Sequence, residues 1–466
     1  MSSIMNQKFQ NCSSFFGQMM AQDYRFVNFK PVLLPLVISF AMLWSSAVSL
    51  PEPGYFPICF RLAMVPILLT LAFDIGTNKS YSLGSPLRDV IFSYWACLIV
   101  FRILDMAVVS LWDESPAPKW IKPRKKILKS APSEGLEGDM KSSNEKEVNT
   151  ATPTNRESVQ YLWTTVPHPP LLSFERALYG LDVVLLNRPG TPWLFPWRLR
   201  SLDWSLPALN RQRKKELNFG QPEWPFLIAL VQQIFHITAH YYIRNLDLDG
   251  KREGARNLWQ INLKDQILVT FALGAIIAFG TSLEEAIVFP LLIKTKILPP
   301  TALLGQSRRA ILSDGLVELW GYRWHHNWRR SFVRTARLFP AGMTAPGNAI
   351  WSFFLSGTMH SIMFSRVYPI PRLSNPCTLI PILWEPGIMF FFISQGIGTV
   401  IEKYLFPNVK TKPNLLRRFW MYAVLIGTGR HLVNSMIIKG WLSAYEWNQL
   451  NYGNVLSDFF GWRLFA

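Results

Sequence analysis

Charged side chains are scarce in this sequence, and acidic ones are the scarcest. Only 17% of the 466 residues are charged, with 30 Asp and Glu against 48 Lys and Arg, and the formal net charge is +18 at pH 7. A charged fraction this low, beside 49% hydrophobic residues, excludes an ordinary soluble domain and favours an integral membrane protein. The basic excess fits anionic lipid or an anionic substrate, because binding of nucleic acid needs a reading module that is not visible in the sequence.

Cysteine is also scarce. The four cysteines have no CxxC spacing, so the sequence indicates neither a disulfide framework nor a zinc site. None has a histidine nearby in the sequence to activate it, which argues against a thiol nucleophile. These residues are Cys12, Cys59, Cys97 and Cys377.

Long apolar runs and aromatic residues are abundant. Aromatic residues make up 14% of the chain, with 19 tryptophans, which suits the belts at membrane–water interfaces. The runs predict about eight transmembrane helices, and therefore an all-α polytopic membrane protein with interfacial amphipathic helices. In the third run Arg102 and Asp105 share a helical face, and we expect an intrahelical ion pair between them. The runs are Pro31–Leu50, Phe56–Ile75, Asp89–Leu111, Trp224–Tyr242, Gln266–Gly280, Ala349–Phe364, Thr378–Val400 and Phe419–Ile438.

Composition divides the chain into three parts. Residues 1–113 hold the N-terminus and the first three predicted spans. Residues 114–160 are rich in Pro, Ser, Lys, Glu, Asn and Thr, and predict a disordered loop because they cannot bury enough apolar surface to fold. Residues 161–466 hold interfacial segments, rich in Trp and Arg, and the remaining spans.

The basic residues predict the orientation in the membrane. The loops between spans three and four, five and six, and seven and eight are all basic near their membrane ends. By the positive-inside rule these loops, including 114–160, are cytosolic and both termini are lumenal. The two glycosylation sequons, at Asn11 and Asn78, then also lie in the lumen, and we expect the endoplasmic reticulum as the location.

Two histidine-containing segments are the candidate functional region. Read as a helix, Leu316–Arg330 places large apolar residues on a four-residue stripe and arginines beside it, which predicts a helix lying in the bilayer interface. His360 lies inside an apolar run, where an ionisable side chain is costly unless it faces protein or a water-filled cavity. The stripe, continued by one turn, consists of Leu316, Trp320, Trp324, Trp328 and Phe332.

These segments resemble a known family. The run Trp320–His325 (WGYRWH) is similar to the F-W-G-R-R-W-H signature of the wax-synthase-like branch of the membrane-bound O-acyltransferases, and Ser356–His360 resembles the segment that follows it. Leu319 stands where the family usually has Phe, and Tyr322 where it usually has Arg. The resemblance covers roughly residues 300 to 400 by motif. It implies that residues 161–466 form an acyltransferase core that uses acyl-CoA as co-substrate, without a tightly bound cofactor.

Acyl transfer to an alcohol requires a base for the hydroxyl proton and donors for the oxyanion. An apolar surrounding disfavours the charged imidazolium, so His360 suits the base, as the resemblance also implies. His325 or Asn327 can orient a substrate or donate a hydrogen bond, and the resemblance favours His325. Coenzyme A is expected to bind at Arg323, Arg329, Arg330 and Trp324, with the three arginines attracting its phosphates.

Chains of this size with one disordered cytosolic loop resemble fungal acetyltransferases that modify terpenoid secondary metabolites. The resemblance therefore implies acetyl-CoA and a terpenoid or meroterpenoid hydroxyl as substrates. It also implies that the protein is surrounded by membrane lipid. A long-chain wax-ester or sterol-ester synthase is the alternative with the same chemistry.

Two other classes compete. His236–His240 forms an HxxxH pair, and with His325 and His326 it resembles the boxes of membrane di-iron oxidases. The seven histidines of the chain are too few for that set, and a zinc site at His236 and His240 lacks a third ligand. A transporter is the second competitor, but the sequence shows no inverted repeat.

Overall fold

The structure is a computed structural model of the chain. The residues that it describes are 30–78, 80–83, 86–113, 117–128, 158–185, 201–202, 257–277, 313–324, 326–367, 382–406 and 415–438, together with several positions between 231 and 248 and residues 295 and 310. Most of these residues are helical.

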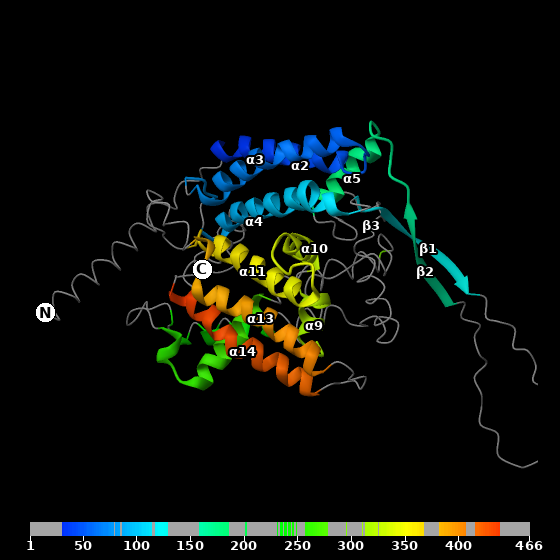
Figure 1. Cartoon of the computed structure of the whole chain (residues 1–466). Helices are drawn as coiled ribbons and strands as arrows, with labels where there is room; N and C mark the ends of the chain where they lie inside the picture. The colour runs from blue at the N-terminus through cyan, green and yellow to red at the C-terminus, as the bar shows by residue number, and fades with distance from the viewer. Residues whose placement is uncertain are drawn as a thin grey trace, which may run out of the picture.

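Six long helices form the body of the described structure. In Figure 1 they lie roughly antiparallel in one stack, from α3 and α2 at the top through α4 and α11 to α13 and α14 at the bottom. Their neighbours in the stack are in contact, so α4 and α11, which lie about 260 residues apart in the sequence, are side by side. The six are α2 (Lys30–Ser49), α3 (Tyr55–Thr77), α4 (Pro86–Ile103), α11 (Ala345–Phe364), α13 (Pro386–Leu405) and α14 (Leu415–Ile438).

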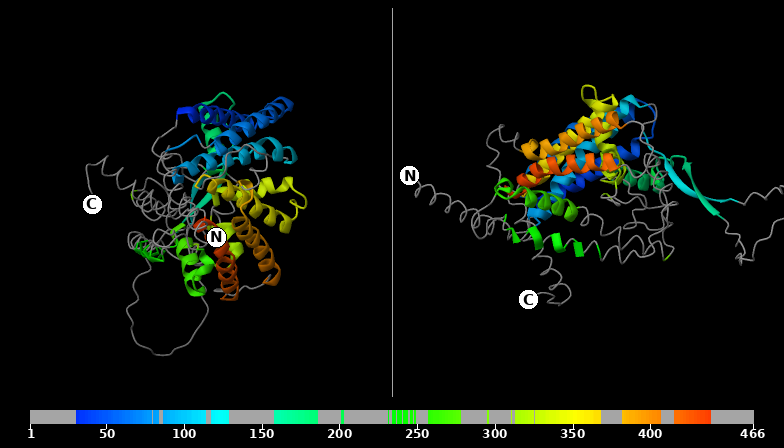
Figure 2. Two further views of the ribbon diagram at one scale, coloured as in Figure 1. Left: turned by 90° about the vertical axis from the view of Figure 1, so that its left-hand side faces the viewer. Right: turned by 90° about the horizontal axis from the view of Figure 1, so that it is seen from below.

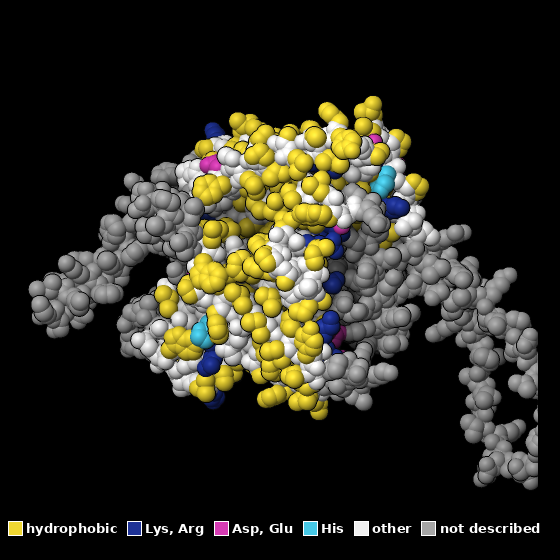
Figure 3. All heavy atoms as spheres, in the orientation of Figure 1, with side chains coloured by type: hydrophobic (Ala, Val, Ile, Leu, Met, Phe, Trp, Pro, Cys, Tyr) yellow, Lys and Arg dark blue, Asp and Glu magenta, His cyan; other side chains and the backbone are white. Residues whose placement is uncertain are grey.

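The outside of this stack is apolar. Figure 3 shows a face covered mostly by hydrophobic side chains, with Lys and Arg gathered mainly at one end of the helices. Four segments are long and apolar enough to cross a membrane: Lys30–Ser49, Tyr55–Thr77, Asp89–Trp112 and Pro386–Leu405. They correspond to four of the predicted spans. The number of about eight stays a prediction.

Shorter elements surround the stack. A helix over residues 263–277 packs near α14, and helical residues also occur between 231 and 245. The remaining short elements are the π-helices η1 (Leu104–Val108) and η6 (Leu319–Arg323), the 3₁₀ turns η2 (Val109–Trp112), η4 (Leu258–Gln260) and η7 (Ala336–Leu338), and the helices α5 (Phe174–Val184), α9 (Leu316–Glu318) and α10 (His326–Thr335).

Asp105 connects α10 to the end of α4. At this point the α-helix passes into the π-helix η1. Asp105 lies in η1, is only 4% exposed, and forms ion pairs with Arg330, at 3.3 Å, and with Arg334. Arg334 also pairs with Asp113. Burial lowers the pKa of the Arg334 guanidinium, because it disfavours the charged form. The attraction and hydrogen bonds of Asp105 and Asp113 have the larger effect, so the pKa is raised overall. The carboxylate for which we expected an intrahelical partner thus forms ion pairs with arginines more than 200 residues away.

Three strands are present where the sequence predicted none. Strand β1 (Trp120–Leu128) pairs antiparallel with β2 (Ser158–Val166) and, at its first two residues, with β3 (Ser201–Leu202). The hairpin of β1 and β2 projects from the helices in Figures 1 and 2. The described structure is mostly helical, as predicted, but it also contains this small sheet, which the all-α prediction lacked. Strand β1, and the start of β2, lie within the predicted loop over 114–160. Residues 129–157 lie outside the described part of the chain.

The base of the hairpin explains why this sheet forms here. Trp120 is 1% exposed, donates from Nε1 to Asp182 of α5 at 2.8 Å, and lies edge to face against Tyr179. The average composition of 114–160 hides Trp120, and the β-prone segment SVQYLWTTV begins only at Ser158, at the end of that window.

Helix α5 is one of the expected amphipathic elements beside the membrane spans. Its buried face packs on α2, where Arg176 donates to the carbonyls of Val48 and Pro169 and pairs with Glu52. The residues just before it are exposed and apolar, with Leu172 99% exposed. Residues 186–200 and 203–230, where further interfacial elements are expected, lie outside the described residues.

The two sequons remain predictions. Asn11 lies outside the described residues. Asn78 ends α3, and its side chain donates to Asp74 and accepts from the backbone and hydroxyl of Ser80.

Candidate active site

The WGYRWH segment does not continue as a regular helix. Helix α9 passes into η6, the chain is extended at Trp324 (φ −126°, ψ 132°), and α10 begins at His326. A π-helix has a wider turn than an α-helix and is frequent at functional sites. The predicted interfacial stripe is therefore broken. Its indoles pack within the protein: Trp328 is 3% exposed against Tyr94 and Phe101, and Trp320 contacts Phe353.

A buried carboxylate holds the start of this segment. Glu402 of α13 is 0% exposed and accepts from the backbone N–H of Leu316 at 2.5 Å and of Val317 at 3.4 Å. Arg417 of α14 neutralises it at 2.6 Å. A side chain at Gly315 would collide with the Glu402 carboxylate, so glycine is required there for this close approach.

A chain of polar side chains fixes Trp320. Its Nε1 donates to Oε1 of Gln395 at 3.2 Å, and Nε2 of Gln395 donates to Thr428 at 2.8 Å. Gln395 is 0% exposed, and Thr428 in turn donates to the carbonyl of Val424. These bonds satisfy polar groups that would otherwise be costly inside the helices, and they link η6 to α13 and α14.

His360 lies in the second half of α11. This helix begins at the N-cap Thr344, which accepts from the N–H of Gly347, and it has Pro346 in its first turn. The Nδ1 of His360 lies 2.7 Å from the carbonyl oxygen of Ser356, and the ring stacks on Phe392 at 4.4 Å between centroids. A carbonyl only accepts, so Nδ1 carries the proton and the neutral ring has its basic lone pair on Nε2.

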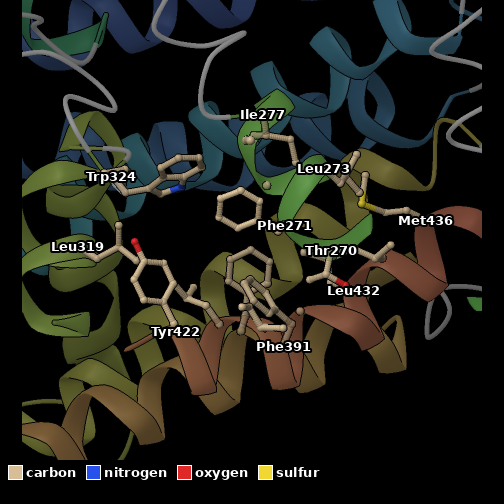
Figure 4. A pocket seen from close by; sticks show the side chains of 18 of the residues that line it. Thr270, Phe271, Leu273, Ile277, Leu319, Trp324, Phe391, Tyr422, Leu432 and Met436 are labelled. Carbon is tan, nitrogen blue, oxygen red and sulfur yellow. The ribbon is translucent and has the colours of Figure 1, made fainter. Parts of the chain in front are cut away.

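A cavity of about 220 Å³ joins the two motifs. Trp320 and Trp324 line it from the first motif and His360 from the second. In Figure 4, Trp324, Tyr422 and Phe391 surround the same open space as Phe271. The wall is almost wholly apolar. Its residues come from η6 and Trp324 after it, α11, α13, α14 and the helix over 263–277, together with Ala310.

The cavity is elongated along α14. The residues of this helix that line it run from Met421 to Met436, which corresponds to about 22 Å of helix. Trp324 and Met421 belong to the end near Glu402 and Arg417, whereas His360 packs beside Phe364 and Phe392. The cavity therefore extends between the two motifs along a mostly apolar wall.

Arg323 and Arg330, which were predicted to bind phosphate, form ion pairs with acidic residues of the chain. Arg323 donates from Nε and Nη2 to Glu318, at 3.1 and 2.9 Å, and Arg330 pairs with Asp105. Arg329 is partly exposed on α10. The pairs reduce the charge that Arg323 and Arg330 present to a ligand, and they fix both side chains beside Trp324 and α10.

Several candidate histidines, and the side chain of Asn327, lie outside the part of the chain that the structure describes. His325, His236 and His240 lie outside the described residues, as do the side chains of His326 and Asn327. Among the residues that are described, no group of three or more His, Cys, Asp or Glu lies close enough to hold a metal ion.

Sequence reasoning did not identify Tyr422, Thr270 and Gly274 as lining residues, nor Gln395 and Glu402 as supports. A signal existed for Gln395 alone, because an amide inside an apolar run is expected to have a structural or functional partner. The others are brought to the site by contacts between distant helices.

Comparison with sequence-family models gives a match over the candidate site. The sequence model described as "Membrane bound O-acyl transferase family" matches residues 303–393, which include η6, His360 and the beginning of α13. The match covers less than a quarter of the chain, and it supports a membrane-bound enzyme that transfers acyl groups. No curated protein and no solved structure matches the chain.

Proposed function

We propose that this chain is an acyl-CoA-dependent O-acyltransferase of the wax-synthase-like kind. It moves an acyl group, acetyl in the first instance, to a hydroxyl of a hydrophobic acceptor such as a terpenoid or meroterpenoid. The observation that carries the proposal is the cavity that Trp324 and His360 both line, within the segment that matches the acyltransferase family.

The chemistry follows from the tautomer of His360. Nε2 removes the proton of the acceptor hydroxyl as its oxygen attacks the thioester carbonyl. When the tetrahedral intermediate collapses, the C–S bond breaks, and the imidazolium returns the proton to the sulfur of coenzyme A. The products are an ester and free coenzyme A, so the base is regenerated. His325 is assigned to the oxyanion, where one hydrogen-bond donor is worth about 10²- to 10³-fold in rate.

The apolar cavity supports this chemistry in two ways. It favours a lipophilic acceptor, and it limits water, which would otherwise hydrolyse the thioester. The arginines at 323, 329 and 330 are proposed to attract the phosphates of coenzyme A from the cytosolic side of an endoplasmic reticulum membrane, with both termini in the lumen.

The elongated shape of the cavity also suits a fatty acyl chain. A long-chain wax-ester or sterol-ester synthase is therefore the second candidate, and the donor distinguishes it from an acetyltransferase.

The test is acyl transfer in membranes that contain the chain, compared with membranes that lack it. Labelled acetyl-CoA and palmitoyl-CoA are offered with a panel of lipophilic alcohols. We expect labelled ester from acetyl-CoA, and a KM for acyl-CoA that rises with ionic strength because salt screens the arginines. Preference for palmitoyl-CoA would select the second candidate, and the absence of ester with every donor would refute acyl transfer.

A further inference from the structure

Gly274 leaves an opening in the wall of the cavity. It lies on the helix over 263–277, about one turn from both Phe271 and Ile277, and all three residues line the cavity. A Cβ placed on Gly274 would meet no atom within 4 Å. The missing side chain therefore adds to the open space.

Two other glycines near the cavity serve a different purpose. A Cβ on Gly429 would lie 2.9 Å from Cγ2 of Thr270, and one on Gly357 would lie 2.9 Å from Sδ of Met389. Those glycines allow helices to approach each other. Gly274 has no such contact, although glycine inside a helix is less favourable than alanine by about 1 kcal/mol. What it provides is volume at the cavity.

The rest of the wall defines what that volume suits. Seven aromatic side chains besides His360 line the cavity, and its surface is almost entirely apolar. Rigid ring faces fit a rigid hydrocarbon skeleton well, because little conformational freedom is lost when the two stack. A flexible linear chain needs no local widening of this kind.

We propose that Gly274 sets the size of the acceptor and that the acceptor is a bulky, ring-bearing apolar alcohol. This inference rests on the proposed acyl transfer. A larger side chain at position 274 would occupy the space of the rings and would leave a short linear alcohol able to enter.

The experiment compares Gly274→Leu with Gly427→Leu in the full chain. Gly427 is a matched control, because it also lies inside a helix, its Cβ would meet no atom within 4 Å, and it does not line the cavity. For each protein kcat/KM is measured with a polycyclic alcohol and with 1-butanol. In Gly274→Leu we expect the ratio of the two values to fall on the order of tenfold, and in Gly427→Leu to stay near that of the parent.

A second readout does not depend on catalysis. A ligand that binds only the folded protein raises Tm, so the polycyclic alcohol should raise the Tm of the parent and of Gly427→Leu, and raise that of Gly274→Leu less. Unchanged acceptor preference in an active Gly274→Leu enzyme would overturn the role of Gly274. If the parent itself formed no ester, the proposed function would fail, and the Tm shifts alone would decide whether Gly274 limits ligand size.

Discussion

Replacing His360 with alanine is expected to lower acyl transfer by about 10²- to 10⁴-fold, the usual contribution of a positioned general base. The ring is held for this role: its Nδ1 donates to the carbonyl of Ser356, its face stacks on Phe392, and it lines the cavity. Alanine removes the only imidazole among the described residues that line this space. The initial rate with saturating acyl-CoA measures the loss.

His431 provides the matched control. It is also a histidine in a long helix and packs against Phe390 and Trp259, but it does not line the cavity. His431→Ala should keep transfer within a few-fold of the parent. Both variants should elute from a sizing column in detergent as the parent does. Equal activity of folded His360→Ala and the parent would remove His360 from the mechanism.

The second large effect concerns stability. Glu402→Ala is expected to lower the free energy of unfolding by about 3–5 kcal/mol, because it leaves the guanidinium of Arg417 without its buried partner. The N–H groups of Leu316 and Val317 lose their acceptor at the same time. Since these groups begin the segment that carries Trp320 and Trp324, transfer activity should fall with stability. Thermal unfolding in detergent measures the change.

Lys403→Ala is the control for Glu402→Ala. Lys403 is the next residue of α13 and is exposed, so its removal should change the free energy of unfolding by less than about 0.5 kcal/mol. If Glu402→Ala unfolded at the same temperature as Lys403→Ala, the carboxylate would not hold this segment in place.

Local patterns in the sequence predicted the parts of the fold that depend on composition. The apolar runs from Pro31, Phe56 and Asp89 correspond to helices α2, α3 and the extended α4, because a membrane-length run of apolar residues has few alternatives to a helix. The same reasoning placed His360 in a helix. Periodicity failed at Trp324, where the chain leaves the helix after a π-turn, and the indoles of the predicted interfacial helix pack against other helices of the protein.

The parts that depend on distant contacts were not predictable in this way. Glu402 meets Leu316 across 86 residues, and Asp105 meets Arg334 across 229. Strand β1 was hidden because polar residues dominate the composition of 114–160, and β2 crosses the boundary at which that segment was predicted to end. The cavity combines residues of several segments that are far apart in the sequence, so its lining could not be predicted from any one of them.

Photolabelling tests the central claim, that the cavity joining the two motifs is where the acceptor binds. A lipophilic alcohol with a diazirine group is activated in membranes containing the chain, and the labelled peptides are identified by mass spectrometry. We expect labels on residues 263–277, 316–324 and 415–438, and their loss when an unlabelled acceptor competes. Labels confined to the lipid-facing sides of α2 and α3, and unaffected by competitor, would contradict the account.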